Sequence, residues 1–231
     1  MKKENIVIIG IGNTAKIIYN FVCQYNLYEV KGFAVDEKYI SSDVFMGLPV
    51  FPIEKLSNII DIKNDYLFCA ILWNRLNADR TKMYLRLKSQ GFRFANLISP
   101  KAVMNGELNG DNCWINDYAK IDYYVSVGSN VFIKSSSFIG DNTIICDHCF
   151  VAENTTIGGG VRIGEQSFIG LGATVFDEVT IGKKCVVGAA TALKRNLPDF
   201  CVFKTNNNCF EIKQYNEEEI ENKLIFSKNI R

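Results

Sequence analysis

The sequence predicts two domains of different architecture, an α/β domain with a short parallel sheet and, after it, a parallel β-helix built from six-residue repeats. Val or Ile recurs at almost every sixth position between Val103 and Val187, and this period predicts the β-helix. In the first hundred residues, short apolar runs alternate with helical patterns, which predicts a parallel sheet with helices on its faces. We therefore expect domains at residues 1–99 and 100–204, and a tail at 205–231 in which a short helix could form.

The repeat has two inward-facing positions. The first is occupied by Val103, Asn109, Ile115, Ile121, Val127, Ile133, Ile139, Ile145, Val151, Ile157, Ile163, Ile169, Val175, Ile181 and Val187. The second, four residues later, is small or β-branched after its first member and includes Cys113, Cys149 and Cys185. A period of six fits neither a helix nor a hairpin but matches three short strands per coil, so these fifteen positions predict five coils. Gly often follows the aliphatic residue, as at Gly140 and Gly164, where we expect it to ease the turn.

Elements of the first domain follow from apolar runs and helix signals. Four strands are predicted, at residues 5–10, 30–35, 66–71 and 92–97. A helix should follow the first strand, and a second helix should span 78–89 with Asn77 as its N-cap.

The first strand runs into a turn, Gly10 to Ala15, that reads Gly-x-Gly-x-x-Ala. Such a turn can hold a phosphate on the N–H groups of the following helix, although a tight turn without a ligand shows the same pattern. Asp36, at the end of the second strand, could accept a hydrogen bond from a hydroxyl or an imide. A complete NAD-binding domain needs more strands than these hundred residues supply, so hydride transfer is the poorer interpretation.

Composition excludes several classes of partner. The 231 residues carry a formal net charge of +1 without a long basic run, which predicts binding neither to nucleic acid nor to an anionic membrane. No apolar run is long enough to span a bilayer, so we expect a cytoplasmic protein. Cys146 and Cys149 form a lone Cys-x-x-Cys pair, which we interpret as small core thiols and not as a metal site.

These features together resemble a known family, the bacterial sugar acyltransferases that combine a Rossmann-like domain with a left-handed β-helix. Members N-acetylate UDP- or dTDP-linked amino sugars or O-acetylate sialic acid. The resemblance extends to about residue 204 and is carried by GIGNTA, FAVD, GLPVFPIEKL, AILWNRLNADR, GFRFANLISPKAV and KKCVVGAATALKRNLPD. It implies a left-handed coil, a homotrimer, a nucleotide-sugar on the first domain, and acyl-CoA along the β-helix between two subunits.

The resemblance also assigns binding residues. It places the nucleotide-sugar against the Gly turn and the second strand, at Gly10, Gly12, Asn13, Thr14 and Asp36. Val35 replaces the first member of the family's acidic pair, and Leu72 aligns with the family's Gly after the third strand. The implied acyl-CoA contacts are backbone atoms near Leu171 and Ala189 and the side chain of Phe150.

The catalytic position departs from the family pattern. The family has a His two residues after the aliphatic that aligns with Ile139, whereas this chain has Asp141 there. The single His of the chain, His148, lies seven residues further on, where relatives carry a similar GDHCF. We take Asp141 as the candidate base, with an ordinary outward turn residue as the alternative. We expect His148 to be a surface residue that is at most auxiliary.

These expectations point to acyl transfer, most simply of acetyl, from acyl-CoA to the amino group of a nucleotide-linked amino sugar in surface-glycan biosynthesis. A sugar amine loses its proton at mildly basic pH, so a modest base suffices, whereas a hydroxyl needs a stronger one. Sugar O-acetylation therefore ranks lower. A non-catalytic nucleotide-sugar-binding trimer stays open as a third function because the family's catalytic His is replaced.

Overall fold

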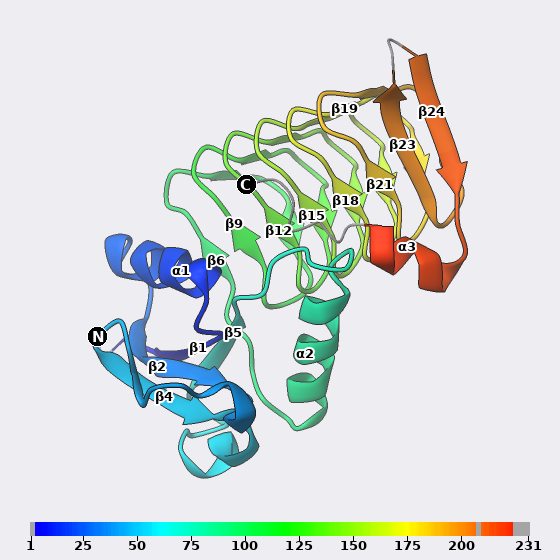
Figure 1. Ribbon diagram of the computed structural model, residues 1–231. Coiled ribbons are helices and arrows are strands. Elements are labelled where there is room, and N and C mark those ends of the chain that lie inside the picture. Colours follow the sequence, from blue (N-terminus) through cyan, green and yellow to red (C-terminus); the bar gives the residue numbers. More distant parts are fainter. Residues whose placement is uncertain (1–2, 207–208, 224–231) are drawn as a thin grey trace. The chain divides into compact units, whose positions relative to one another are not determined.

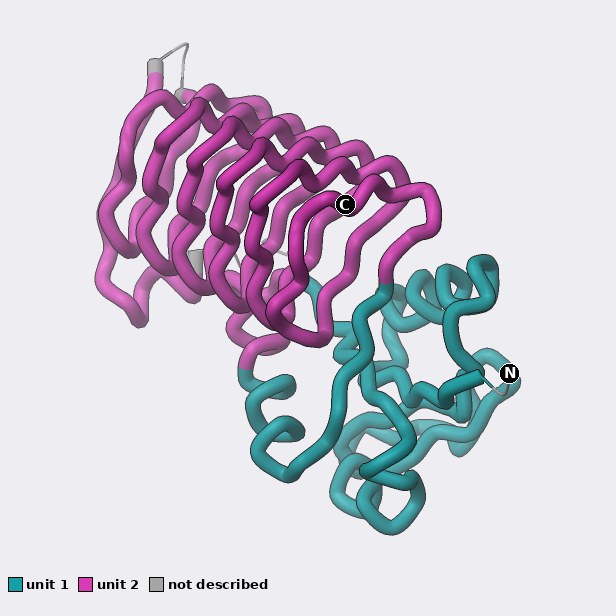
Figure 2. Tube along the Cα trace, turned by 180° about the vertical axis from the view of Figure 1, so that it is seen from behind, with its two compact units in different colours: residues 1–72, 82–97 teal, residues 73–81, 98–231 magenta. Residues whose placement is uncertain are grey.

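The chain divides into two compact units, which Figure 2 colours separately. The computed structural model describes residues 3–206 and 209–223. The first unit holds residues up to Leu72 together with Lys82–Leu97, and the second holds Trp73–Thr81 and the chain from Ile98 onward. A short stretch of the first hundred residues thus packs with the β-helix, which a single boundary near residue 99 does not anticipate.

A five-stranded sheet forms the first unit (Figure 1). Its order is β3 (Val44–Phe45), β4 (Leu48–Pro52), β2 (Glu29–Val35), β1 (Asn5–Ile9) and β5 (Tyr66–Cys69). The strands β4, β2, β1 and β5 are parallel, and β3 joins β4 as an antiparallel hairpin. The helices α1 (Asn13–Gln24) and α2 (Ala78–Ser89) and the short 3-10 helices η1 (Glu37–Tyr39) and η2 (Ile53–Asn58) complete the elements in this part of the chain.

Two local predictions for the first hundred residues are wrong. The run 92–97 is not one continuous strand: it pairs with β5 only through a bridge between Phe94 and Leu67, and Leu97 begins strand β6 (Leu97–Ile98). Asn77 does not cap α2 with its side chain. Its amide donates to the Ser167 carbonyl at 3.3 Å because the residue is buried against the β-helix.

Three parallel sheets form the faces of the β-helix in the second unit (Figure 1). The first face contains β7 (Val103–Met104), β10 (Lys120–Ile121), β13 (Phe138–Ile139), β16 (Thr156–Ile157), β19 (Thr174–Val175) and β22 (Ala192–Leu193). The second contains β8 (Glu107–Leu108), β11 (Ser126–Val127), β14 (Ile144–Ile145), β17 (Arg162–Ile163) and β20 (Thr180–Ile181). The third contains β6 (Leu97–Ile98), β9 (Trp114–Ile115), β12 (Phe132–Ile133), β15 (Phe150–Val151), β18 (Phe168–Ile169), β21 (Val186–Val187), β23 (Cys201–Asn206) and β24 (Cys209–Gln214).

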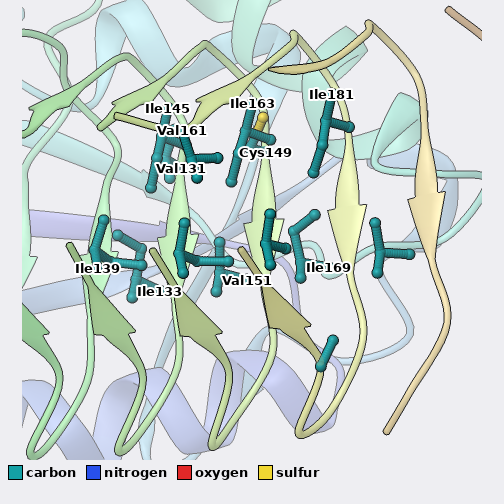
Figure 3. Packing of buried hydrophobic residues seen from close by; sticks show 14 of the residues in the cluster. Val131, Ile133, Ile139, Ile145, Cys149, Val151, Val161, Ile163, Ile169 and Ile181 are labelled. Carbon is teal, nitrogen blue, oxygen red and sulfur yellow. The ribbon is translucent and has the colours of Figure 1, made fainter. Parts of the chain in front are cut away.

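One coil takes eighteen residues, so that Ile133 pairs with Val151 and Val151 with Ile169. The predicted aliphatic and small positions form one continuous core, whose side chains Figure 3 shows in rows along the inside of the coils. Cys113, Cys149 and Cys185 belong to this core and are fully buried. They act as packing residues, as the sequence predicts.

The register differs from the prediction at both ends of the prism. Val103 is 48% exposed, and Met104 and Leu108 take the inward places opposite Ile121 and Val127. Asn109 is therefore not a member of the aliphatic column. At the other end, Leu193, Leu197 and Phe203 continue the core beyond Val187. A terminal coil has a neighbour on one side only, so its repeats can change length without disturbing a second coil.

Each turn at a corner of the prism between Asn112 and Ala190 contains a residue with positive φ. The corner residues recur every six positions, at Asn112, Tyr118, Tyr124, Asn130, Ser136, Asn142, His148, Asn154, Gly160, Gln166, Gly172, Glu178, Lys184 and Ala190. Asn and Gly adopt this left-handed conformation most readily, which explains their frequency there. We name the corners after residues on them: the Asp141 corner joins the first and second faces, the His148 corner the second and third, and the Leu171 corner the third and first.

The glycines after the aliphatic residues serve a purpose other than the one predicted. A Cβ on Gly164 would lie 2.4 Å from the carbonyl carbon of Gly182 in the next coil, and one on Gly140 would lie 2.6 Å from that of Gly158. Because neither residue has a positive φ, close stacking of the coils, and not an unusual turn, requires glycine here.

The chain after the prism forms an antiparallel hairpin of β23 and β24 and then helix α3 (Glu217–Lys223). The hairpin is not predicted, and the part of the proposed tail helix after residue 223 lies outside the described residues. None of the helices in the described ranges is long and apolar enough to cross a membrane.

Candidate active site

Aspartate occupies the position just before the corner residue in several turns, where it usually has a structural function. Asp147, Asp177 and Asp199 each accept, through Oδ1, the backbone N–H of a residue in the preceding coil. The three donors are Ser129, Gly159 and Lys183, at 2.7, 2.7 and 2.9 Å. Such a carboxylate joins two coils by a charge-assisted hydrogen bond.

Asp141 occupies the same turn position but does not make this bond. The corresponding N–H, that of Tyr123, donates to Asp122 Oδ1 at 3.0 Å instead. The Asp141 carboxylate is exposed and accepts a hydrogen bond from Asn142 Nδ2 at 2.7 Å. In the next coil Gly159 leaves room for it, because a Cβ there would lie 2.9 Å from Asp141 Oδ1. Asp141 thus differs from the three structural aspartates, and its assignment as the base stays a prediction.

The surroundings of Asp141 are aromatic and acidic. Asp122, Tyr123, Tyr124, Asp141 and Asn142 line an open depression at the Asp141 corner. Both tyrosines are largely exposed. Sequence reasoning singled out Asp141 alone, although two adjacent tyrosines one coil earlier were a usable signal.

His148 lies on a different corner from Asp141 and is buried, with 4% of its surface exposed, so the prediction of a surface residue is wrong. Its Nδ1 lies 3.0 Å from Asn130 Nδ2. Asn130 Oδ1 accepts hydrogen bonds from Arg80 Nε at 3.1 Å and from Asn112 Nδ2 at 2.7 Å, so the Asn130 amide nitrogen faces the His148 ring. Nδ1 therefore accepts and Nε2 carries the proton, 3.9 Å from Glu165 Oε1. Burial lowers the pKa of His148 to about 4, so the imidazole is neutral at neutral pH.

Arg80 holds this corner from outside. Its Nη2 donates to the carbonyls of Asn130, His148 and Cys149 at 3.1–3.3 Å, and its guanidinium lies 4.1 Å from the centroid of the Phe132 ring. These contacts explain the burial of His148 and give the residue a structural function. Sequence reasoning did not identify Arg80, because nothing local distinguishes a buried Arg in the first turn of a helix.

The residues predicted to contact acyl-CoA lie in two places, the Leu171 corner and the third face of the prism. Leu171 and Ala189 occupy the same corner one coil apart, and the N–H of Ala190 donates to the Leu171 carbonyl at 2.8 Å. Leu171 is 54% exposed. Phe150 instead lies on the third face, 3% exposed, with its ring stacked on Phe168 at 5.3 Å. The structure thus brings Leu171 and Ala189 together but encloses the Phe150 ring.

A buried amine that the sequence did not reveal lies on the third face. Lys134 Nζ lies 3.6 Å from the centroid of the Trp114 ring and 3.8 Å from Glu153 Oε1. Burial lowers the pKa of Lys134 to about 8, although Glu153 opposes this shift. The Lys134 ammonium therefore loses its proton at a lower pH than the ammonium of a surface lysine.

In the first unit, the predicted phosphate turn has an open helix N-terminus. Gly10 has a φ of +121° and its N–H donates to the Ala34 carbonyl at 2.8 Å. Gly12 caps α1 without a side-chain hydrogen bond, and the first turn has no acidic residue. No acidic side chain of the first turn would therefore compete with an anion bound at the N–H groups of Asn13 and Thr14.

The sheet order places this turn at a change of direction. From β1 the chain proceeds to β2 and β4 on one side and returns to β5 on the other. In parallel sheets ligands bind at such a point, outside the carboxyl ends of the strands. Gly10 follows β1 there, and Leu72 follows β5 two residues after Ala70, whose N–H donates to the Ile9 carbonyl at 2.9 Å.

Asp36 follows β2 at the same edge and forms an ion pair with Arg86 of α2. Arg86 also lies 3.8 Å from Glu54 Oε1. Asp36, Glu37, Lys38, Glu54 and Arg86 line an open depression. The ion pair orients the Asp36 carboxylate. No group of three or more His, Cys, Asp or Glu side chains that could hold a metal occurs among the residues described.

Comparison with known proteins agrees with this geometry. The hexapeptide repeat of succinyl-transferase matches residues 160–195, and no curated protein matches the sequence. A histidine-to-asparagine variant of perosamine N-acetyltransferase from Caulobacter crescentus, solved with CoA and GDP-perosamine, is 26% identical. The alignment covers 91% of this chain and 97% of that chain with a TM-score of 0.79, so both units are included. The chain is a hexapeptide-repeat acyltransferase.

Two further structures share the fold of this acyltransferase. The acetyltransferase domain of PglB from Neisseria gonorrhoeae is 18% identical, with 92% of this chain and 100% of that chain covered and a TM-score of 0.76. WeeI from Acinetobacter baumannii is 19% identical, with 90% and 99% covered and a TM-score of 0.74. The predicted fold, a Rossmann-like domain and a left-handed β-helix, is confirmed.

Proposed function

We propose that this acyltransferase transfers an acetyl group from acetyl-CoA to the amino group of a nucleotide-linked amino sugar in surface-glycan biosynthesis. The similarity to perosamine N-acetyltransferase carries the proposal, because it extends over both units and that protein was solved with CoA and GDP-perosamine. Acetyl-CoA and nucleotide sugars meet in the cytoplasm, where we place the reaction.

Asp141 is the general base of the proposed reaction. The sugar amine attacks the thioester carbonyl, the tetrahedral intermediate collapses with cleavage of the C–S bond, and CoA leaves as its thiolate. The proton that the amine loses passes to Asp141, directly or through water. The supporting observation is that the Asp141 carboxylate is exposed and exempt from the coil-to-coil bond that Asp147, Asp177 and Asp199 make.

The acyl donor lies on the Leu171 corner, against backbone atoms near Leu171 and Ala189, with Phe150 on the neighbouring face. In one chain, Leu171 and Asp141 lie on different corners of the prism. The donor and the base therefore meet only where a second copy brings its corner alongside, and for that reason we propose a homotrimer with the reaction at each subunit seam.

The nucleotide part of the acceptor binds the first unit. Its diphosphate takes the N–H groups of Gly12, Asn13 and Thr14, with Gly10 and Leu72 beside it, and the Asp36 carboxylate accepts from the base or ribose. The open helix N-terminus and the change of sheet direction support this assignment.

Replacing Asp141 tests the proposed chemistry. With acetyl-CoA and a panel of UDP-, dTDP- and GDP-linked amino sugars, Asp141→Asn should lower kcat by roughly 10²–10⁴ with KM little changed. Asp177→Asn is the matched control, because Asp177 occupies the same turn position. An amide oxygen can keep its structural bond to the Gly159 N–H, so kcat should be unchanged. His148→Asn should cost far less than Asp141→Asn.

Other results would revise the function. An equal loss of kcat in Asp177→Asn would assign a structural function to Asp141. Acetylation of a sugar hydroxyl instead of the amine would establish the O-acetyltransferase. Binding of nucleotide sugars without turnover would favour a non-catalytic nucleotide-sugar-binding trimer.

Calorimetry tests the nucleotide site. Nucleotide sugars should bind more tightly than NAD, and Asp36→Ala should weaken them roughly ten-fold, because a hydrogen bond to a charged group is lost. Glu37→Ala is the control, since Glu37 lines the same depression but pairs with Lys55 at the surface, at 3.0 Å. Tighter binding of NAD, or no change in Asp36→Ala, would contradict the assignment.

A further inference from the structure

Two neighbouring tyrosines stand on the Asp141 corner one coil before the proposed base. Tyr123 is 60% exposed and Tyr124 80%, and their ring centroids lie 6.5 Å apart with the planes inclined by 50°. Tyr123 is eighteen residues before Asp141, so the two occupy the same place in successive coils. The N–H of Asn142 donates to the Tyr123 carbonyl at 3.1 Å, which holds the two turns in contact.

Tyr124 occupies a corner position that its side chain does not favour. Its φ is +59°, whereas the next two residues in the same column, Asn142 and Gly160, are of the types that adopt positive φ readily. With most of its surface exposed, Tyr124 gains little from packing within the chain. The ring therefore benefits from a contact outside the chain.

The charges around the tyrosines select the kind of molecule that fits there. Asp122 and Asp141 contribute two carboxylates and Asn142 an amide, while one cation, Lys120, lies 3.5 Å from Asp122 Oδ2. The net charge of these side chains is negative, which disfavours the phosphates of a nucleotide or of CoA. It suits an amino sugar, whose ammonium is attracted to carboxylates and aromatic faces and whose hydroxyls can hydrogen-bond to them.

We propose that Tyr123 and Tyr124 form the wall on which the pyranose ring of the amino-sugar acceptor stacks, with the amine directed at Asp141. The C–H face of the sugar contacts the rings, and Asp122, Asp141 and Asn142 receive its polar groups. Asp122 acts as a positioning residue, because it takes the Tyr123 N–H and so leaves the Asp141 carboxylate free. The inference rests on the proposed function and specifies the sugar subsite of that reaction.

The test separates the contribution of the sugar from that of the nucleotide. Calorimetry measures the affinity of each nucleotide-linked amino sugar and of the matching nucleoside diphosphate, and their ratio gives the gain due to the sugar. In Tyr124→Asn this gain should fall roughly five-fold, the size of a stacked aromatic contact, while the nucleoside diphosphate binds as before. Asn suits the positive φ, so the variant should fold, and Tyr124→Phe should keep the gain.

Tyr118 provides a matched control. It is also a corner residue, with a φ of +61° and 63% of its surface exposed, but it lies on the Leu171 corner. Tyr118→Asn should leave the gain due to the sugar unchanged. Light scattering should give the same mass for both variants as for the wild type.

Several outcomes would overturn the inference. The first is an unchanged gain in affinity due to the sugar in Tyr124→Asn, and the second is an equal loss of that gain in Tyr118→Asn. The third is a lower mass of Tyr124→Asn in light scattering, which would assign the tyrosines to a subunit interface. If the wild type itself shows no gain from any amino sugar, the proposed function fails as well. If the wild type shows the gain and Tyr124→Asn retains it, the proposed function stands and the sugar wall alone is refuted.

Discussion

At the residue scale, one hydrogen bond distinguishes the structural aspartates from Asp141, the proposed base. Asp141 and Asp177 have the same side chain in the same place of the repeat, yet only Asp177 accepts an N–H from the coil before it. For Asp141 that donor is taken by Asp122. The hydrogen bonding of Asp141 thus depends on Asp122, nineteen residues earlier in the chain.

The same scale explains the behaviour of the only histidine. Its pKa is about 4 in the folded chain because of burial, against about 6.5 when unfolded. Between these values the unfolded state binds the extra proton, so stability falls as pH falls from 6.5 to 4 and loses nothing more from this residue below 4. The loss amounts to about 3 kcal/mol.

Thermal unfolding measured against pH checks this expectation. The difference in unfolding free energy between wild type and His148→Asn should shrink as pH falls through that window, since Asn does not titrate there and accepts the positive φ. As the chain has one histidine, its NMR signal is assigned without ambiguity and should titrate near pH 4. A midpoint near 6.5 would refute the buried, neutral state.

At the element scale, the segment Trp73–Thr81 packs against the β-helix at the expense of backbone strain. Arg75, Leu76 and Asn77 have φ values of 51°, 53° and 65°, three consecutive residues in the left-handed region. Each costs about 1–2 kcal/mol in this conformation, Asn less. Buried contacts offset the strain, among them the bond from Gln166 Nε2 to the Leu76 carbonyl at 3.0 Å.

Arg80 is the strongest of these attachments. Arg80→Ala should destabilise the protein by about 2–4 kcal/mol, because it leaves the carbonyls of Asn130, His148 and Cys149 without this donor and removes the cover of Phe132. Arg80→Lys should not restore stability, since an ammonium cannot reproduce the planar fork.

The control for Arg80 is Arg75→Ala, which removes two half-exposed ion pairs with Asp79 and Glu221 at 3.6 and 3.7 Å. It should change the free energy of unfolding by no more than about 0.5–1 kcal/mol. Denaturant unfolding measures both variants. Equal losses in the two would mean that the buried network of Arg80 contributes little.

At the scale of the whole molecule, the proposed reaction involves more than one chain. Leu171 and Asp141 lie on different corners of the prism, and the proposed trimer would bring the Leu171 corner of one subunit alongside the Asp141 corner of the next. Light scattering at micromolar concentration should give about three times the 26.1 kDa chain mass. A monomer that retains full activity would contradict both the trimer and the shared site.

The sequence by itself determined the β-helix, because a six-residue period with inward Val and Ile is a local property that repeats in every coil. It also located the Gly turn and the strands around it, since each is set by residues adjacent in the chain. The sequence did not determine the register of the end coils. Val103 faces out and Met104 faces in, because an outermost coil packs against one neighbouring coil only.

The tertiary structure alone decided which polar residues are free to act. His148 looks like a surface turn residue until Arg80, sixty-eight positions earlier in the chain, covers its corner. The freedom of Asp141 depends on a bond made by Asp122 in the preceding coil. Both are contacts between residues far apart in sequence, and no local pattern records which donor a carboxylate or an imidazole will meet.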